Sequence, residues 1–317
     1  MNPSILEILE ANRHKYISGE EIANQLYMTR ANVWKEVQKL KKSGIEISSV
    51  RNLGYKLIDY NGTLSRSILL NAIPHLNNIE IFESIPSTND YAKTRISDNM
   101  LILANHQSKG KGRLGRSFYS PNKSGIYLSL TLLPKLDIMD VQLITICAAL
   151  SVCVTLESLY KLEPKIKWLN DIYLNNHKLC GILTEGEIEL ENNNFRHIIL
   201  GIGLNTNLAD DIPKEIASIY TALSQHISVP IDRNQLIIEI LNNFYHFYTH
   251  LPTNRYQLID LYKQRSNVLG KRVTIKNKGD ESFFVEDITS QAHLVVVDKH
   301  GNRHELNSGE ISLGVIS

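Results

Sequence analysis

The chain of 317 residues is long enough for two or three domains and for a large buried core. Its 34 lysines and arginines nearly cancel its 33 aspartates and glutamates, which argues against a protein that coats nucleic acid along its whole surface. Charged residues at 21% and hydrophobic residues at 43% argue against a disordered chain. Any activity must therefore come from local groups of residues.

No segment predicts secretion, a membrane span or a disulfide framework. The N-terminus lacks the basic head and cleavage site of a secretory signal. The longest apolar run, Leu143 to Leu156, is shorter than the ~20 residues that span a bilayer, so it predicts a buried helix. Cys147, Cys153 and Cys180 form no CxxC pair, and we expect small buried side chains in a reducing compartment. A soluble cytoplasmic protein without a membrane partner is expected.

The N-terminal residues predict a helix-turn-helix unit. Apolar side chains at helical spacing predict a first helix within Pro3–Arg13. Ser18 and Glu21, three residues apart, form a capping box that opens a short helix over Glu20–Leu26. A further helix is expected from Thr29 to Lys42, and two helices joined by so short a turn are typical of this unit.

A strand hairpin, or wing, is expected to follow. Gly44 should stop the helix, and the alternation from Ile45 onward with a turn at Arg51–Gly54 predicts two antiparallel strands. Between Tyr27 and Lys56, seven basic and two acidic residues give a net charge of +5. Basic groups neutralise phosphates, and Asn, Gln and Arg can read base edges, so this surface predicts DNA binding. The alternative is a solvated basic helix in a protein-binding module. The predicted DNA-binding residues are Thr29, Arg30, Asn32, Trp34, Lys35, Gln38, Lys39 and Arg51.

The rest of the chain divides into a linker, a large domain and a small one. Asp59–Thr63 reads as a linker, and strands alternate with helices from Leu64 to Ser266. Four short strands are expected in a small β barrel: Lys271–Ile275, Ser282–Ile288, His293–Val297 and Arg303–Leu306, with turns at Asn277–Asp280 and Lys299–Asn302. We therefore predict an α+β protein with three domains, over residues 1–62, 63–266 and 267–317.

The segment from Gln107 to Ser117 is dense in glycine and positive charge. Gly110, Gly112 and Gly115 fit the spacing of a dinucleotide-binding fingerprint, and the segment nearly fits a P-loop, but both motifs must open a helix. Here loop residues follow and then a predicted strand over Ile126–Leu132, which excludes both motifs. The four cations of the loop are Lys109, Lys111, Arg113 and Arg116. Because they repel one another and glycine exposes backbone N–H groups, we predict a nucleotide-phosphate loop that orders when phosphates arrive; an exposed solvated loop or a second DNA contact is the alternative.

A second cluster extends from Lys165 to Leu183. Its alternation predicts three antiparallel strands with turns near Asn170 and Asn175. Lys167 and Lys178 would lie on different strands, and each is either a cation aimed into a cleft or an edge lysine that deters aggregation. His246 and His250 stand four residues apart without the glutamate of a zinc-protease motif, so no metal site is predicted.

Four motifs follow one another along the chain: Ser87-Thr88-Asn89-Asp90, the glycine loop, KWxNDxYxxxxKxxGIL over Lys167–Leu183, and GxGxN over Gly201–Asn205. With the flanking winged helix and β barrel, the whole chain resembles the bifunctional biotin–protein ligase and biotin-operon repressor family. The resemblance implies a central domain like those of class II aminoacyl-tRNA synthetases and an SH3-like C-terminal barrel. It also implies that biotin and MgATP form biotinyl-5′-AMP, which biotinylates a lysine of the biotin carboxyl carrier protein of acetyl-CoA carboxylase.

The same resemblance implies roles for individual residues. Lys178 would lie between carboxylate and α-phosphate, and Arg113 would hold the phosphate, so these two are the predicted catalytic residues. Asn170 and Asp171 would position Mg²⁺ and ATP or organise their turn. The predicted biotin-binding residues are Ser87, Thr88, Asn89, Gln107, Lys111, Gly112, Arg113 and Lys178. The predicted ATP or adenylate residues are Gly110, Arg116, Phe118, Asn170, Asp171, Gly181, Gly203 and Asn205.

Two positions depart from the family, which commonly has Pro where this chain has Leu169 and Trp where it has Phe118.

The resemblance also implies regulation with biotinyl-5′-AMP as corepressor. The adenylate would order the basic loop and promote a homodimer that binds operator DNA. The carrier protein would compete for the same face. The alternatives are a non-catalytic biotin-responsive repressor, a lipoate-type acyl ligase, and a biotin ligase that no longer represses.

Overall fold

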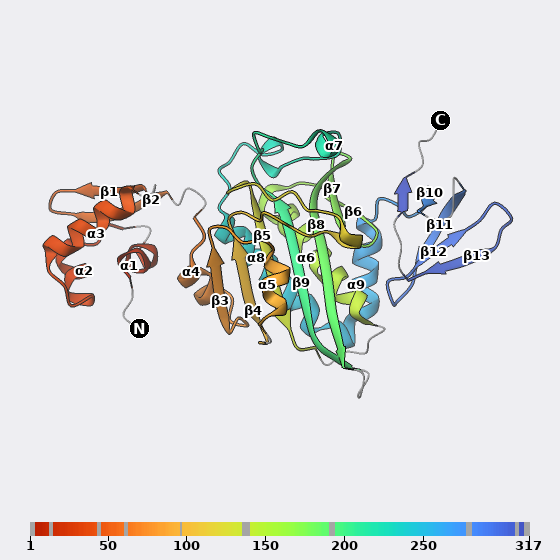
Figure 1. Cartoon of the computed structure of the whole chain (residues 1–317), viewed down its shortest axis with the longest axis horizontal. Helices are drawn as coiled ribbons and strands as arrows, with labels where there is room; N and C mark the ends of the chain where they lie inside the picture. The colour runs from red at the N-terminus through yellow and green to blue at the C-terminus, as the bar shows by residue number, and fades with distance from the viewer. Residues whose placement is uncertain are drawn as a thin grey trace. The chain divides into compact units, whose positions relative to one another are not determined.

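The structure is a computed structural model that describes residues 4–12, 15–42, 46–59, 63–95, 97–134, 140–189, 194–276, 281–307 and 311–313. Its fold is α+β. The chain forms two compact units, Met1–Pro74 with Ile231–Leu236, and His75–Pro230 with Ile237–Ser317. Figure 1 labels the elements of both units.

The first unit contains the expected helix-turn-helix and wing. Its elements are α1 (Ile5–Ala11), α2 (Gly19–Gln25), α3 (Arg30–Lys42), the antiparallel strands β1 (Glu46–Val50) and β2 (Gly54–Asp59), and α4 (Arg66–Ala72). Ser18 Oγ accepts a hydrogen bond of 3.0 Å from the backbone N–H of Glu21, which confirms the predicted N-cap. Val33 and Val37 of α3 are fully buried in the core of the unit. The predicted helix stop at Gly44, the strand residue Ile45 and the linker residues 60–62 lie outside the described residues.

The wing turn depends on one glycine. Gly54 has φ +105°, and a Cβ at this position would lie 2.0 Å from the carbonyl oxygen of Ile17. The close approach exists because Ile17 and Tyr55 exchange backbone hydrogen bonds of 2.9 Å. Only glycine fits the turn, and the hairpin is thereby fastened to the chain in front of α2.

The second unit is built on a mixed seven-stranded sheet of order β3-β4-β5-β9-β8-β7-β6. The strands are β3 (Asn78–Phe82), β4 (Met100–Ala104), β5 (Gly125–Leu132), β6 (Lys165–Lys167), β7 (Asp171–Leu174), β8 (His177–Glu189) and β9 (Asn194–Asn205). β3 and β4 are parallel, and the remaining pairs are antiparallel. The β6–β7–β8 meander confirms the three strands predicted over 165–183.

Helices cover both faces of this sheet. Figure 1 shows α5 (Thr88–Lys93) in front of the sheet and α6 (Val141–Tyr160) with α9 (Leu251–Arg265) behind it. The shorter elements are the turn η1 (Arg113–Gly115), α7 (Lys214–Ala217) and η3 (Leu223–Gln225), and α8 (Arg233–Thr249) begins within the residues of the first unit.

The apolar helix α6 is a core helix, as the sequence predicts. It is long and apolar enough to cross a membrane, but 72% of its most apolar stretch is buried inside the protein. Its Cys147 and Cys153 are buried free thiols, as is Cys180 on β8. Their burial is as expected, and it raises the pKa of all three thiols, so they stay protonated.

The C-terminal strands form a five-stranded antiparallel sheet of order β13-β12-β11-β10-β14. They are β10 (Arg272–Ile275), β11 (Ser282–Ile288), β12 (Leu294–Val297), β13 (Arg303–Leu306) and β14 (Ile311–Leu313). The four predicted strands are confirmed, and β14 was not predicted because it is only three residues long. The predicted turn at 277–280 lies outside the described residues.

Candidate active site

A pocket of about 300 Å³ opens in the second unit, between the glycine loop and the strands β7, β8 and β9. All eight residues predicted for biotin line it: Ser87, Thr88, Asn89, Gln107, Lys111, Gly112, Arg113 and Lys178. Six of the eight predicted for the adenylate also line it: Arg116, Phe118, Asn170, Asp171, Gly181 and Gly203. The structure thus brings together in space motifs that lie far apart in the sequence.

One end of the pocket is an uncharged hydrogen-bond network at the start of α5. Ser87 caps this helix, and its Oγ accepts from the backbone N–H of Asp90 at 3.3 Å. Thr88 Oγ1 donates to Gln107 Oε1 at 3.0 Å, and Gln107 Nε2 donates to Ser120 Oγ at 2.9 Å. Because each member is held by the next, these side chains present fixed donors and acceptors to a polar ring.

Asn89 is fixed from three sides. Its Nδ2 donates to Glu185 Oε2 on β8 at 2.8 Å, and its Oδ1 accepts from the fully buried Ser129 on β5 at 2.6 Å. A Cβ on Gly201 would lie 2.3 Å from Asn89 Oδ1, so the amide lies directly on this glycine. Glu185 in turn accepts from Lys93 Nζ at 2.8 Å. The amide orientation is therefore determined by charged and buried partners.

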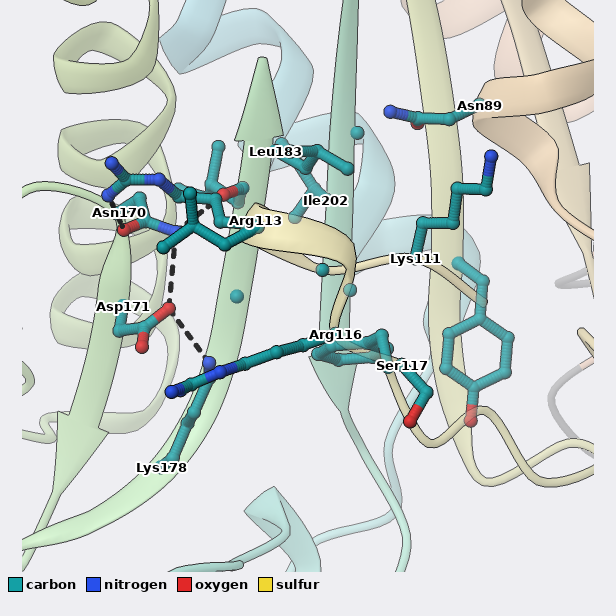
Figure 2. A pocket seen from close by; sticks show the side chains of 18 of the residues that line it. Asn89, Lys111, Arg113, Arg116, Ser117, Asn170, Asp171, Lys178, Leu183 and Ile202 are labelled. Carbon is teal, nitrogen blue, oxygen red and sulfur yellow. Dashed lines mark hydrogen bonds and ion pairs between the residues drawn. The ribbon is translucent and has the colours of Figure 1, made fainter. Parts of the chain in front are cut away.

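The glycine loop contains the short 3₁₀ turn η1 and opens no α-helix before β5, which confirms the exclusion of the two nucleotide motifs. Gly112 N–H donates to Arg116 O at 2.8 Å around η1. Arg113 reaches across the pocket and donates from its NH1 to Asn170 Oδ1 at 2.9 Å, whereas Lys111 lies on the opposite side (Figure 2). Its Nζ is 2.6 Å from Asp90 Oδ1. Two loop cations thus have partners on opposite walls.

Gly110 and Asn205 do not line the pocket, but both support it. A Cβ on Gly110 would lie 2.5 Å from Phe118 O, so the loop needs glycine there. Asn205 is 5% exposed and donates to Thr221 O at 3.0 Å. Both residues therefore support the pocket from outside its lining and do not face the space inside it.

Phe118 follows the loop, and its ring lies against two glycines of the sheet. A Cβ on Gly203 would be 2.4 Å from the ring, and one on Gly181 would be 3.2 Å from it. The ring also meets Tyr127 edge-on, with centroids 6.4 Å apart. Phenylalanine therefore retains the aromatic face at this position, and the glycines are needed to accommodate it.

Lys178 and Asp171 form the charged end of the pocket. Lys178 Nζ is 2.8 Å from Asp171 Oδ1, and the dashed contacts in Figure 2 join this pair to Asn170. Asn170 Nδ2 donates to Ile182 O at 2.7 Å, which ties the β6–β7 turn to β8. Asn170 thus organises the turn and at the same time holds Arg113.

The turn before Asn170 is anchored from two other elements. Trp168 Nε1 donates at 2.8 Å to Ala292 O in the turn between β11 and β12, and Tyr262 of α9 donates to Leu169 O at 3.1 Å. The Trp168–Leu169 peptide is cis. Leu169 is buried, and burial raises the pKa of Tyr262 well above its usual value, so its hydroxyl stays a donor.

Several pocket residues were not predicted: Tyr127, Leu128, Trp168, Tyr173, Leu183, Ile202, Ile219 and Ile311. Lys167 also lines the pocket, with Nζ 5.8 Å from the Tyr173 ring centroid. Trp168, Tyr173 and Leu183 belong to a motif that carried the signal. Ile311 lies on the unpredicted β14, and Ile219 lies in a segment that hydrogen-bonds beside Lys178.

No group of three or more His, Cys, Asp and Glu gathers among the described residues. Asp171 is the one carboxylate among those that line the pocket. Water molecules or a bound phosphate would therefore supply most of the ligands of a metal ion in this pocket.

The predicted DNA-binding residues lie on α3, in the residue before it and at the wing tip. All of them are exposed except Gln38, which is half-buried. Trp34 is 55% exposed, which is unusual for a tryptophan outside a contact surface. Lys39 pairs with Glu36 at 2.5 Å, and Thr29 Oγ1 accepts from Asn32 N–H at 3.3 Å to cap α3. This arrangement fits a helix that reads a groove.

Comparisons with known proteins agree with this architecture. Residues 81–205 match the biotin/lipoate A/B protein ligase family, and residues 4–56 match a helix-turn-helix domain. The bifunctional ligase/repressor BirA of Bacillus spizizenii is 33% identical over 82% of each chain, and that of Escherichia coli is 28% identical over 70% of this chain and 69% of its own. The biotin protein ligase of Aquifex aeolicus, solved with biotin and ATP, is 25% identical with a TM-score of 0.66, over 75% of this chain and 99% of its own.

Proposed function

Since the chain belongs to the family of bifunctional biotin–protein ligases and biotin-operon repressors, we propose that its pocket joins biotin to AMP and that Lys111, Arg113 and Lys178 hold the anionic groups. The protein is an ATP-dependent biotin ligase and a DNA-binding repressor. Its product is the biotinylated lysine of a biotin carboxyl carrier protein.

In the first half-reaction a carboxylate oxygen of biotin attacks the α-phosphorus of MgATP, and pyrophosphate leaves. Two anions must approach each other, and negative charge increases on the phosphoryl oxygens. Lys178 is held 2.8 Å from Asp171, so its ammonium is fixed before the substrates meet. Its remaining N–H donors can bind the carboxylate and the phosphate, which favours the transition state over the separate anions.

Arg113 supplies the second fixed cation. Its guanidinium is oriented by the hydrogen bond to Asn170 Oδ1, and a planar cation held in this way suits the adenylate phosphate. The uncharged network of Thr88 and Gln107 suits the ureido ring of biotin, whose N–H and C=O groups need fixed partners. Alignment of the reactants in such a pocket contributes on the order of 7–11 kcal/mol.

In the second half-reaction the amine of the carrier lysine attacks the biotinyl carbonyl of the mixed anhydride. AMP leaves from that carbon, an amide forms and the amine proton is lost to solvent. The glycine loop must retain the adenylate until the carrier arrives, because a released mixed anhydride would acylate any lysine. Its contacts to both walls of the pocket suit this task.

We further propose that Mg²⁺ enters with ATP and not as a resident ion. A single pocket carboxylate, Asp171, fits a metal that keeps its waters and binds mainly through substrate phosphates. Magnesium would neutralise phosphate charge there, and Asp171 would help to position it.

We propose that the adenylate formed in the pocket also regulates DNA binding. Biotinyl-5′-AMP acts as corepressor in the cytoplasm, a homodimer forms when it is bound, and the paired α3 helices and wings bind an operator. The exposed basic surface of the first unit supports the DNA contact. We also propose that the chain has three domains, with boundaries at 62/63 and 266/267.

One observation supports the ligase function most strongly: the same pocket contains a neutral polar network and three cations with fixed partners. The test incubates the full chain with biotin, ATP, Mg²⁺ and a purified apo carrier domain. Mass spectrometry should show one biotin on one carrier lysine and biotinyl-5′-AMP bound noncovalently to the enzyme. A carrier of unchanged mass, with no adenylate, would contradict the function.

A further inference from the structure

Lys111 of the glycine loop is held by a carboxylate that neither half-reaction uses. Asp90 Oδ1 lies 2.6 Å from Lys111 Nζ. Asp90 belongs to the first turn of α5, where its backbone N–H is bound by the capping Ser87. This helix contacts β4, β5 and β9, so Asp90 has a fixed position relative to the sheet.

The loop beyond Lys111 makes few close contacts at its tip. Leu114 is 71% exposed, and a Cβ on Gly115 would have no neighbour within 4 Å. Arg113 is bound to Asn170 on the far wall, so Lys111–Asp90 is the matching attachment on the α5 wall. The backbone N–H of Lys109 also donates to Pro86 O at 2.8 Å, just before α5. The ion pair adds a side-chain attachment to this backbone contact.

We propose that Asp90 is a positioning residue, which holds Lys111 over the pocket and keeps the glycine loop against α5. A lysine ammonium has three N–H donors. One donor binds Asp90, and the other two remain for an oxygen of the anionic substrate. Asp90 thus restricts the orientation of the ammonium without touching biotin or ATP.

Asp90 has a second neighbour, Lys93, at 3.6 Å, but Lys93 is closer to Glu185, at 2.8 Å. The loop contact is therefore the shorter interaction of Asp90. Lys111 and Asp90 are 45% and 39% exposed, so the pair is partly screened by solvent. An exposed pair of this kind shifts an equilibrium by about two- to fivefold.

The test measures hydrogen–deuterium exchange of residues 109–117 in the full chain without substrate. Asp90→Asn should raise the exchange rate about two- to fivefold, and Asp90→Glu should stay near the parent value. Glu83→Gln removes one exposed acidic charge from the same unit outside the pocket and should leave loop exchange unchanged.

A double-variant cycle tests whether Asp90 acts through Lys111. Lys111→Gln should raise loop exchange to the same extent, and the combined variant should exceed neither single variant. In biotin-dependent adenylate formation, Asp90→Asn should raise the KM for biotin about two- to fivefold and change kcat by less than about twofold. Unchanged loop exchange in Asp90→Asn, or additive effects in the combined variant, would overturn the proposal.

This inference rests on the proposed function for its kinetic readout alone. If the parent protein forms no adenylate, the ligase function fails while the exchange experiment still decides whether Asp90 holds the loop. If adenylate forms and loop exchange does not respond to Asp90→Asn, the function stands and the role of Asp90 is refuted.

Discussion

Lys178 on β8 forms an ion pair with Asp171 on the neighbouring antiparallel strand β7, with Nζ and Oδ1 2.8 Å apart. Their side chains are 29% and 24% exposed, so water partly reaches the pair and the ammonium remains able to take a further anion. The contact fixes a cation at the charged end of the pocket, while Asn170 links the same turn to Arg113. One turn thereby positions both of the cations that we propose to bind the reacting anions.

Replacement of Arg113 by glycine should release the adenylate. The variant loses the contact across the pocket to Asn170 and a phosphate ligand, so biotinyl-5′-AMP should dissociate roughly tenfold faster or more. The measurement is biotinylation of an unrelated lysine-rich protein in the same vessel as the carrier. Lys109→Gln, an exposed loop change outside the pocket, is the matched control and should stay carrier-specific. A carrier-restricted pattern for Arg113→Gly would count against its phosphate role.

Gly203→Ala should disturb ATP binding through Phe118. The new methyl would lie 2.4 Å from the ring, which must move, and overpacking of this kind costs about 1–3 kcal/mol. We expect a lower Tm and a clearly raised KM for ATP, with the KM for biotin less affected. Adding Phe118→Leu should restore the Tm by removing the clash. If Gly203→Ala alone leaves both Tm and KM unchanged, the ring does not lie where the structure has it.

Alkaline pH should destabilise the protein through buried tyrosines. Burial, with a contribution from Asp171, raises the pKa of Tyr173 to about 12, and burial raises that of Tyr220 to about 12 as well. A raised native pKa means that the folded state holds protons which the unfolded chain releases near pH 10. The contribution of these two tyrosines to the free energy of unfolding should therefore be fully present below about pH 10 and be lost as the pH rises from 10 to 12. Urea titrations of Tyr173→Phe should show a smaller fall over that window, and an identical fall would argue against the burial.

Lys35→Ala should weaken DNA binding without affecting ligation. Lys35 is exposed on α3, and loss of one phosphate contact should reduce the slope of log Kd against log salt by about one. Fluorescence anisotropy with DNA from the upstream region of the biotin-synthesis genes, in the presence of biotin and ATP, gives this slope. Lys15→Ala, outside the predicted contact surface, should keep the parent slope. An unchanged slope for Lys35→Ala would remove it from the interface.

Local sequence signals predicted much of the fold. The capping serine at position 18, the turn at Arg51–Gly54 and the alternation around Asn170 each depend on residues a few positions apart, and each element formed as expected. The glycine loop was also recognisable, because its glycines and charges are adjacent in the sequence. Both kinds of feature are governed by short-range backbone preferences.

Contacts between distant residues could not be predicted in this way. Asn89 meets Ser129 and Glu185 across 40 and 96 positions, and Lys111 meets Asp90 across 21. Leu169 is held by Tyr262, 93 positions away. Such pairs depend on how strands are ordered in the sheet, which no local pattern encodes. Ile311 was not predicted for another reason: the three residues of β14 are too few to show the alternation of a strand.

Biotin-dependent exchange of labelled pyrophosphate into ATP isolates the first half-reaction and therefore tests adenylate formation most directly. The parent protein should exchange label only when biotin is present. Lys178→Met should reduce the exchange rate by about 10²–10³-fold while its Tm stays close to that of the parent, because one preorganised cation is lost from the transition state. Lys165→Met, an exposed change on β6 outside the pocket, should exchange at the parent rate. Exchange without biotin would contradict biotin adenylation, and full exchange by Lys178→Met would contradict the proposed role of Lys178.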